Sequence, residues 1–246
     1  MKRLSLWLVL AMLMSCIFVS PASAALADCG AFGNWHEGVY KDRNLNYVSN
    51  GTSSIVTVRS SALCGNQHTN NNIALAWTMI ASTDGRGWAQ AGFANYWGNP
   101  NGTVHFTQYK QGSCCSAVTY FGSQHLLSGQ KYQYSERYIV NSYCLHSIGC
   151  LQGRVDNIIW FSTDFDPAGR WATPWLNEYE GETTYTGSDV PGLATSKTAF
   201  QSMQNQKADG TWEPQRCGMN DSHANPRWDH GLTGCDSRQV WTARLS

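Results

Sequence analysis

Three glutamates occupy alternate positions between Trp175 and Tyr185, at Glu178, Glu180 and Glu182. Side chains alternate between the two faces of a β-strand, so an extended conformation would place all three carboxyl groups on one side of a sheet. Neighbouring positions on that face are roughly 7 Å apart, and flexible glutamates could bring two carboxyls to the roughly 5 to 5.5 Å of a retaining glycosidase. Crowding would raise at least one pKa and supply an acid beside a nucleophile. The alternative interpretation is a charged strand face or edge without catalysis.

The spacing of Glu178-Tyr179-Glu180-Gly181-Glu182 resembles the E-x-D-x-E strand of the jelly-roll clan of β-glucanases and xyloglucan endotransglucosylases, which are secreted. The resemblance implies a glycoside hydrolase in which Glu178 is the nucleophile, Glu180 takes the place of the helper aspartate and Glu182 is the acid/base. This sequence has Glu instead of Asp in the middle, and Gly181 where that clan normally has a bulkier apolar residue. Glycine in a strand often marks a bulge, which would break the alternation.

Aromatic residues are the second candidate for function. The sequence has 11 tryptophans and 11 tyrosines, more than a core of this size needs. Trp77 and Trp160 lie among Ile and Leu and are predicted to be core residues. Exposed rings could stack on sugars or hydrogen-bond to them, and we expect such a role for Trp97, Trp171, Trp175, Tyr179 and Trp228. The alternative is that a disulfide-rich β-sandwich uses tryptophan to fill space.

No metal or cofactor site is predicted. His36-Glu37 lacks the second histidine of a zinc-protease helix, and the histidines near the C-terminus have loop spacing rather than a recognised ligand pattern. The alternative interpretation of that C-terminal stretch is a metal bound by Asp221, His223, Asp229 or His230. A G-x-S-x-G nucleophile motif and a phosphate-binding glycine loop are both absent from the sequence.

The first 24 residues have the features of a secretory signal peptide. Lys2 and Arg3 precede an apolar run over residues 4–19, and a small-x-small ending favours cleavage after Ala24, with Ala27 as the alternative. The sequence has 17 basic and 17 acidic residues, so removing this segment leaves a small acidic excess. Such a charge balance argues against nucleic acid or an anionic membrane as partner and favours a neutral extracellular polymer, such as a polysaccharide, or a protein surface.

Cysteines indicate disulfide bonds. Cys16 lies in the predicted signal peptide, and an even number of cysteines in an exported chain favours disulfides over metal or redox chemistry. The remaining eight are Cys29, Cys64, Cys114, Cys115, Cys144, Cys150, Cys217 and Cys235. The favoured pairs are Cys29–Cys64 and Cys217–Cys235, with Cys114 and Cys115 joined to Cys144 and Cys150. The alternative for the two neighbours is a bond to each other, which needs a distorted peptide.

The apolar pattern predicts an all-β chain, because apolar residues alternate in short runs separated by Gly, Asn, Asp and Pro. We expect a two-sheet antiparallel β-sandwich of jelly-roll type over residues 25–246, with a loop-rich, disulfide-held C-terminal region at about 213–238. Residues 73–82 and 88–97 should form a hairpin, and 116–121 should pair with 131–140. Other expected strands cover 52–60, 104–109, 154–161, 173–185 and 239–245, while 199–205 is either a helix or part of a hairpin.

Together these features predict a secreted protein that binds a polysaccharide or another extracellular polymer. The alternative is a glycoside hydrolase that uses the glutamate face. A second alternative is an interaction or inhibitor domain that acts on other secreted proteins. The sequence does not indicate an oligomeric state.

Overall fold

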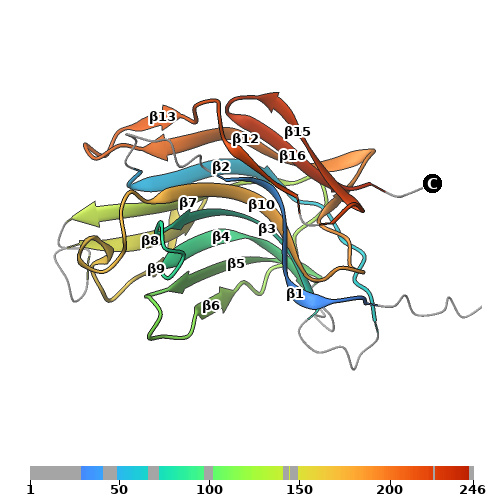
Figure 1. The fold of residues 1–246 in the computed structure, drawn as a ribbon, viewed down its shortest axis with the longest axis horizontal. Helices are drawn as coiled ribbons and strands as arrows, with labels where there is room; N and C mark the ends of the chain where they lie inside the picture. Colours follow the sequence, from blue (N-terminus) through green and yellow to red (C-terminus); the bar gives the residue numbers. More distant parts are fainter. Residues whose placement is uncertain are drawn as a thin grey trace, which may run out of the picture.

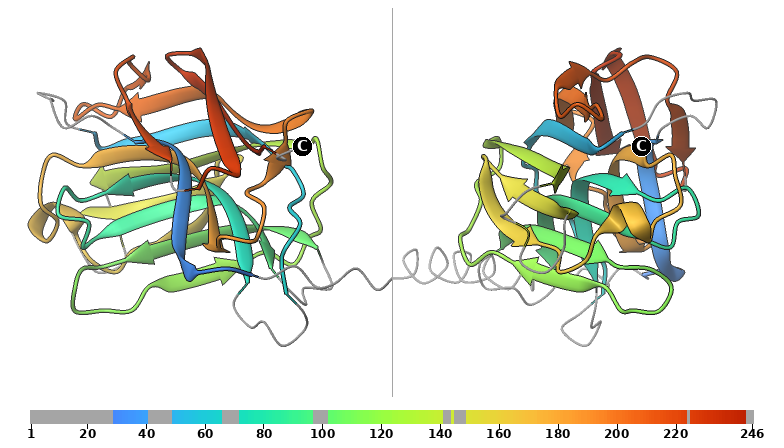
Figure 2. Two further views of the ribbon diagram at one scale, coloured as in Figure 1. Left: turned by 45° about the vertical axis from the view of Figure 1, so that its right-hand side comes forward. Right: turned by 90° about the vertical axis from the view of Figure 1, so that its left-hand side faces the viewer.

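The protein folds as a two-sheet, almost entirely antiparallel β-sandwich, which confirms the predicted fold class (Figures 1 and 2). The computed structural model describes residues 29–40, 49–65, 72–96, 102–140, 144, 149–223 and 225–243. The predicted signal peptide and Trp97 lie outside these residues. Within them, no helix has the length and apolar character needed to cross a membrane.

The first sheet has the order β14–β1–β10–β3–β4–β5–β6 among the described residues. Its strands are β1 (Phe32–Tyr40), β3 (Ile73–Ala81), β4 (Trp88–Tyr96), β5 (Thr103–Lys110), β6 (Val118–Phe121), β10 (Leu176–Tyr185) and β14 (Asn220–His223). The strand that carries the three glutamates, β10, lies between β1 and β3 and is therefore not an edge strand.

The second sheet has the order β15–β16–β11–β12–β2–β7–β8–β9, with β13 paired to β12. Its strands are β2 (Gly51–Thr57), β7 (Lys131–Val140), β8 (Gly149–Val155), β9 (Ile158–Ser162), β11 (Gly192–Leu193), β12 (Ser196–Gln206), β13 (Trp212–Pro214), β15 (Trp228–Gly234) and β16 (Ser237–Thr242). A short 3-10 helix, η1 (Pro167–Gly169), begins where the Asp166 side chain accepts a hydrogen bond from the backbone of Ala168. Strands β15 and β16, red in Figure 1, are the last two strands in the described part of the chain. Strand β15 lies near β1 of the first sheet.

The core lies between the sheets and is built from alternate residues of both. Val39, Phe93, Tyr134 and Phe200 are fully buried there. Glu136 of β7 also points into this interior, where it accepts a hydrogen bond of 3.0 Å from the hydroxyl of Thr78. Burial raises the pKa of Glu136 well above its ordinary value, which favours the neutral acid and allows a carboxyl group to be accommodated in the core.

Several predicted elements are confirmed and others are wrong. The predicted hairpin of residues 73–82 with 88–97 is observed in the described residues as β3 and β4, which ends at Tyr96. Residues 199–205 form a strand that makes a hairpin with β13. Residues 154–161 are not one strand: Asp156 and Asn157 both have positive φ and turn the chain from β8 into β9. The predicted pairing of 116–121 with 131–140 is also wrong, because β6 pairs with β5 while β7 belongs to the other sheet.

Four disulfides connect the eight cysteines. Cys29–Cys64 and Cys217–Cys235 confirm the prediction. The expected cross-pairing of the other four is wrong, since the structure joins Cys114 to Cys115 and Cys144 to Cys150. The physical reason is position: Cys114 and Cys115 lie in the loop after β5 of the first sheet, whereas Cys150 is the second residue of β8 in the other sheet.

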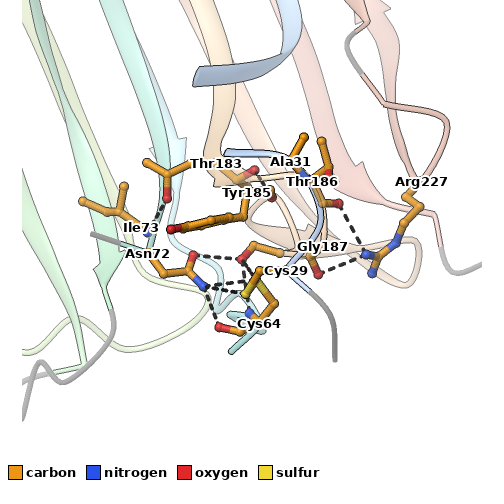
Figure 3. The surroundings of a disulfide bond; sticks show 12 residues. Cys29, Ala31, Cys64, Asn72, Ile73, Thr183, Tyr185, Thr186, Gly187 and Arg227 are labelled. Carbon is orange, nitrogen blue, oxygen red and sulfur yellow. Dashed lines mark hydrogen bonds between the residues drawn. A yellow bond between two sulfur atoms is a disulfide. The ribbon is translucent and has the colours of Figure 1, made fainter. Parts of the chain in front are cut away.

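The Cys29–Cys64 disulfide is surrounded by hydrogen bonds (Figure 3). The Asn72 side chain donates to the carbonyl of Cys64 at 2.6 Å and accepts from Ser188 Oγ at 2.9 Å. Arg227 donates to the carbonyl of Gly187 at 3.0 Å. These contacts tie the segment before β1 to the end of β10 and to the turn before β15. The C-terminal region over 213–238, expected to be rich in loops, contains β14 and β15 and is closed by Cys217–Cys235.

Gly38 should be essential for the close approach of β1 to β10. Its φ is +149°, and a Cβ atom would lie 2.4 Å from the carbonyl oxygen of Tyr179. We expect Gly38→Ala to lower the free energy of unfolding by about 1 to 3 kcal/mol, measured by thermal denaturation. Gly112→Ala is the matched control, because a Cβ there meets nothing within 4 Å. Equal melting temperatures for the two variants would contradict this account.

Candidate active site

The glutamate face exists as predicted. The register of β10 against β3 is unbroken from Leu176 to Thr183, so Gly181 does not form a bulge and the expectation of one was wrong. Glu178, Glu180 and Glu182 therefore share the outer face of the first sheet, while Tyr179 between them points into the core. Gly181 has a packing role, because a Cβ there would lie 3.2 Å from Val240 of the other sheet.

Glu178 and Glu182 form part of one wall of a groove on this outer face. The groove has a volume of about 600 Å³. Its floor is mainly apolar, with Leu75, Trp77, Met79 and Phe106 from β3 and β5. Its polar groups include His36, Glu178, Glu182, Gln90 and Gln108. The site thus combines an apolar channel with carboxyl groups along one side.

His36 organises two of the three carboxyl groups. Its Nδ1 lies 2.8 Å from Glu180 Oε2, and its Nε2 lies 3.7 Å from Glu182 Oε1. The indole of Trp77 donates a hydrogen bond of 2.9 Å to the other oxygen of Glu182. Glu180 is 2% exposed, so it supports the site from beneath rather than meeting a ligand. Glu178 lines the groove, and the charge of His36 acts on it as well.

Burial and charge shift the pKa values in this group. Burial raises the pKa of Glu178 to about 8, and the negative charge of Glu180 adds to the effect. Burial also raises the pKa of Glu182, against the opposing effects of His36 and Trp77. For His36, burial lowers the pKa, but the hydrogen bond to Glu180 and the charges of the glutamates outweigh it and raise the pKa to about 9. In neutral solution, therefore, His36 is an imidazolium and Glu178 carries a proton that it can donate.

A row of polar side chains crosses the sheet from Glu178. Glu178 is opposite Met79, and Met79 is opposite Gln90 on the next strand. Strand spacing places the backbones of Glu178 and Gln90 roughly 10 Å apart, so their side chains flank the groove above Met79. Gln90 donates to Gln108 Oε1 at 2.7 Å, and Gln108 donates to Thr119 Oγ1 at 2.7 Å. These hydrogen bonds orient the Gln90 amide.

Sequence reasoning missed His36, Gln90 and Gln108 as site residues. A weak signal existed for Gln90, because it is an amide side chain on the face of β4 that also carries Trp88 and Ala94. His36 gave no local signal, since its partners are more than a hundred residues away in the sequence. Only strand order brings them together.

The predicted exposure of the aromatic residues was wrong. Trp171 is 5% exposed, Trp175 4%, Tyr179 0% and Trp228 1%. The rings of Trp171 and Trp175 pack against each other at 5.6 Å in a core cluster, and Trp228 donates its indole hydrogen to the carbonyl of Ser188. Trp171, Trp175 and Trp228 lie near strand ends and turns, but their rings are buried in the protein. These side chains therefore offer no open surface for stacking on a ligand.

The two tryptophans assigned to the core differ. Trp77 is fully buried, as predicted, but on the groove side of the sheet. Trp160 is only partly buried, packed against the main core.

No protein-family model and no curated protein matches the sequence. Solved structures share the fold. Scytalido-glutamic peptidase, solved with a peptide-based transition state analog, is similar with a TM-score of 0.52 and 11% identity, over 86% of this chain and 100% of that chain. SCP-B, a member of the Eqolisin family of peptidases solved with the tripeptide Ala-Ile-His, gives the same values. At this identity the likeness concerns the fold alone.

A glycoside hydrolase family 16 endo-glucanase from Bacteroides ovatus is also similar, with a TM-score of 0.37 and 12% identity, over 67% of this chain and 74% of that chain. This weaker likeness supports no conclusion about function.

Ionisation of the buried Glu178 carboxyl group should destabilise the folded protein as the pH rises. Its pKa is about 8 in the folded protein against an ordinary value of 4.5, so its contribution to stability is fully present below pH 4.5 and is lost as the pH rises through 8. Glu178→Gln stays neutral throughout. We therefore expect this variant to melt a few degrees above the wild type at pH 9, at about 2 to 4 °C for each kcal/mol, and to match it at pH 4.5. A pH-independent difference in melting temperature would refute the assignment.

Proposed function

We propose that this protein is an exported hydrolase of peptide bonds in which Glu178 donates the proton. The observation that carries the proposal is the Glu178 carboxyl group at the wall of an apolar groove, with an oriented side-chain amide on the other side of Met79. Burial raises the pKa of this carboxyl group to about 8, which suits a proton donor. An apolar channel along a sheet suits an extended polypeptide, whose apolar side chains it can bury. The shared fold with two peptidases, one of them solved with a tripeptide, supports this substrate class.

Glu178, Glu182, Gln90 and His36 each have a role in this proposal. Glu178 gives its proton to the departing amine nitrogen, and Glu182 takes a proton from the attacking water. The Gln90 amide donates a hydrogen bond to the carbonyl oxygen as negative charge develops on it, as side chains of an oxyanion hole do. His36 holds Glu180 and Glu182 in place, and its positive charge offsets the repulsion between the carboxylates. Together these groups supply a proton donor, a base and an oxyanion donor for hydrolysis by water.

Hydrolysis of a polysaccharide is the second candidate function. The unbroken face of Glu178, Glu180 and Glu182 favours it, because this is the arrangement that the resemblance to the β-glucanase clan requires. In that case Glu178 would be the nucleophile and Glu182 the acid/base. Polysaccharide binding in the same groove without cleavage would rely on Trp88, which is partly buried and lines it. The four disulfides fit an oxidising extracellular location for either function.

The mature protein should release new amino termini from an unfolded protein substrate such as reduced casein. Glu178→Gln should abolish this release, because it removes the donated proton, while Glu213→Gln should leave it unchanged. Glu213 lies on β13 in the other sheet and serves as the matched control. Parallel incubation with soluble and insoluble polysaccharides should give neither new reducing ends nor loss of protein from solution.

Other outcomes of the same assay would replace the proposal. New reducing ends that Glu178→Gln removes would favour the glycoside hydrolase, and depletion onto an insoluble polysaccharide without cleavage would favour a binding protein. Gln90→Met keeps the size of the side chain but removes its donor, and it should lower kcat on peptides by about 100-fold. Full activity in this variant would remove Gln90 from the mechanism.

The rate of peptide hydrolysis should fall as the pH rises through about 8. The reason is that Glu178, with a pKa of about 8, then loses the proton that it donates. The measurement is kcat/KM between pH 5 and pH 10 under conditions in which the protein stays folded. A rate that increases through pH 8 would show that Glu178 acts as a base instead.

A further inference from the structure

Glu37, His223 and His230 meet on the side of β1 that faces away from the groove. Glu37 follows His36, and alternation along the strand directs the two side chains to opposite faces. Glu37 is fully buried, and it is opposite His223 of β14 in the strand register. One nitrogen of each histidine and a carboxylate oxygen of Glu37 all lie within 4.8 Å of one another.

We propose that these three residues bind a zinc ion. Two imidazoles and one carboxylate form a donor set that zinc uses in proteins, with water in the fourth position. Tetrahedral ligands at zinc bond lengths are roughly 3.3 Å apart, so the three donor atoms need only small shifts to close around the metal. His223 Nδ1 lies 2.9 Å from Glu37 Oε1, and His230 Nδ1 contacts the same oxygen.

Asp221 provides an independent observation for the site. Its Oδ1 lies 3.2 Å from Nε2 of His230, the ring nitrogen that faces away from Glu37. A histidine that binds a metal typically donates its other N–H to a carboxylate, which fixes the ring and its tautomer. With the Nε2 proton donated to Asp221, Nδ1 of His230 would supply the lone pair that binds the metal.

Charge and access also suit a divalent cation. The carboxylates of Glu37 and Asp221 together balance the two positive charges of such an ion. The His223 side chain is 51% exposed, so the site opens to solvent. A metal can enter from this side, and a water molecule can complete the coordination.

The proposed ion would clamp the C-terminal region onto the rest of the sandwich. Glu37 and His223 belong to the first sheet, whereas His230 belongs to β15 of the second. Strands β14 and β15 both lie between Cys217 and Cys235 in the sequence. The disulfide closes this segment on itself, and the metal would attach the segment to β1. The ligand Glu37 is adjacent in β1 to His36, which lines the groove.

The test uses the mature protein without a histidine tag, stripped with EDTA and titrated with Zn²⁺ by calorimetry. We expect one zinc ion per chain. His223→Gln should weaken binding at least about 100-fold, and Asp221→Asn should weaken it about 10- to 100-fold. His125→Gln, at another exposed histidine far from the cluster in sequence, should bind like the wild type. Co²⁺ should give the absorption bands of a tetrahedral site in the wild type and lose them in His223→Gln.

Thermal denaturation separates a metal site from a plain ion pair. Zinc should raise the melting temperature of the wild type and not that of His223→Gln. The proposal is overturned if the wild type binds no zinc, if His223→Gln binds it equally well, or if the variant differs from the wild type by the same amount with and without zinc. His223 is exposed, so its replacement should leave the fold intact, which circular dichroism verifies.

Discussion

The unbroken register of β10 between β1 and β3 is the constraint on which the rest of the structure depends. Because β10 is paired on both sides over the region of the glutamates, its side chains must alternate strictly. Glu178, Glu180 and Glu182 are thereby fixed on the groove side, and Tyr179 is fixed in the core, where its hydroxyl bonds to Thr52 and to the carbonyl of Gln204. A shift of the β10 register by one residue would turn the three glutamates into the core and Tyr179 toward the groove.

Such an arrangement concentrates negative charge on a partly buried surface, and the structure offsets it in two ways. His36 supplies a positive charge between Glu180 and Glu182, and the Trp77 indole supplies a hydrogen bond to Glu182. For Glu178, burial instead favours the neutral acid at physiological pH. The same physical problem, carboxyl groups out of water, thus produces both the ion pair that orders the site and the proton that the proposed chemistry needs.

The sequence predicted what depends on neighbours in the chain. The alternating glutamates, the hairpin across Asp84 to Gly87 and the Cys217–Cys235 disulfide all follow from local patterns, and all are observed. Contacts that depend on the order of strands in the sheet could not be predicted from local sequence patterns. His36 meets Glu180, and Gln90 flanks Glu178 across Met79, only because β1, β10, β3 and β4 are neighbours in the sheet.

Tryptophan positions were misleading for a related reason. Pro and Gly near Trp171 and Trp175 suggested a surface, but both rings are buried in a core cluster with residues of both sheets, such as Ile80 and Leu151. Local composition reports how the backbone turns, and it says little about what covers a side chain. Similarly, Glu37 and His230 are almost two hundred residues apart in the sequence and meet because β15 lies against β1.

The most direct test of the account is an NMR titration of the glutamate side-chain carboxyl carbons, with Glu178→Gln used to assign the signal of Glu178. The account predicts a midpoint near pH 8 for Glu178. A midpoint near the ordinary value of 4.5 would contradict it, because Glu178 would then be ionised at neutral pH and would have no proton to donate.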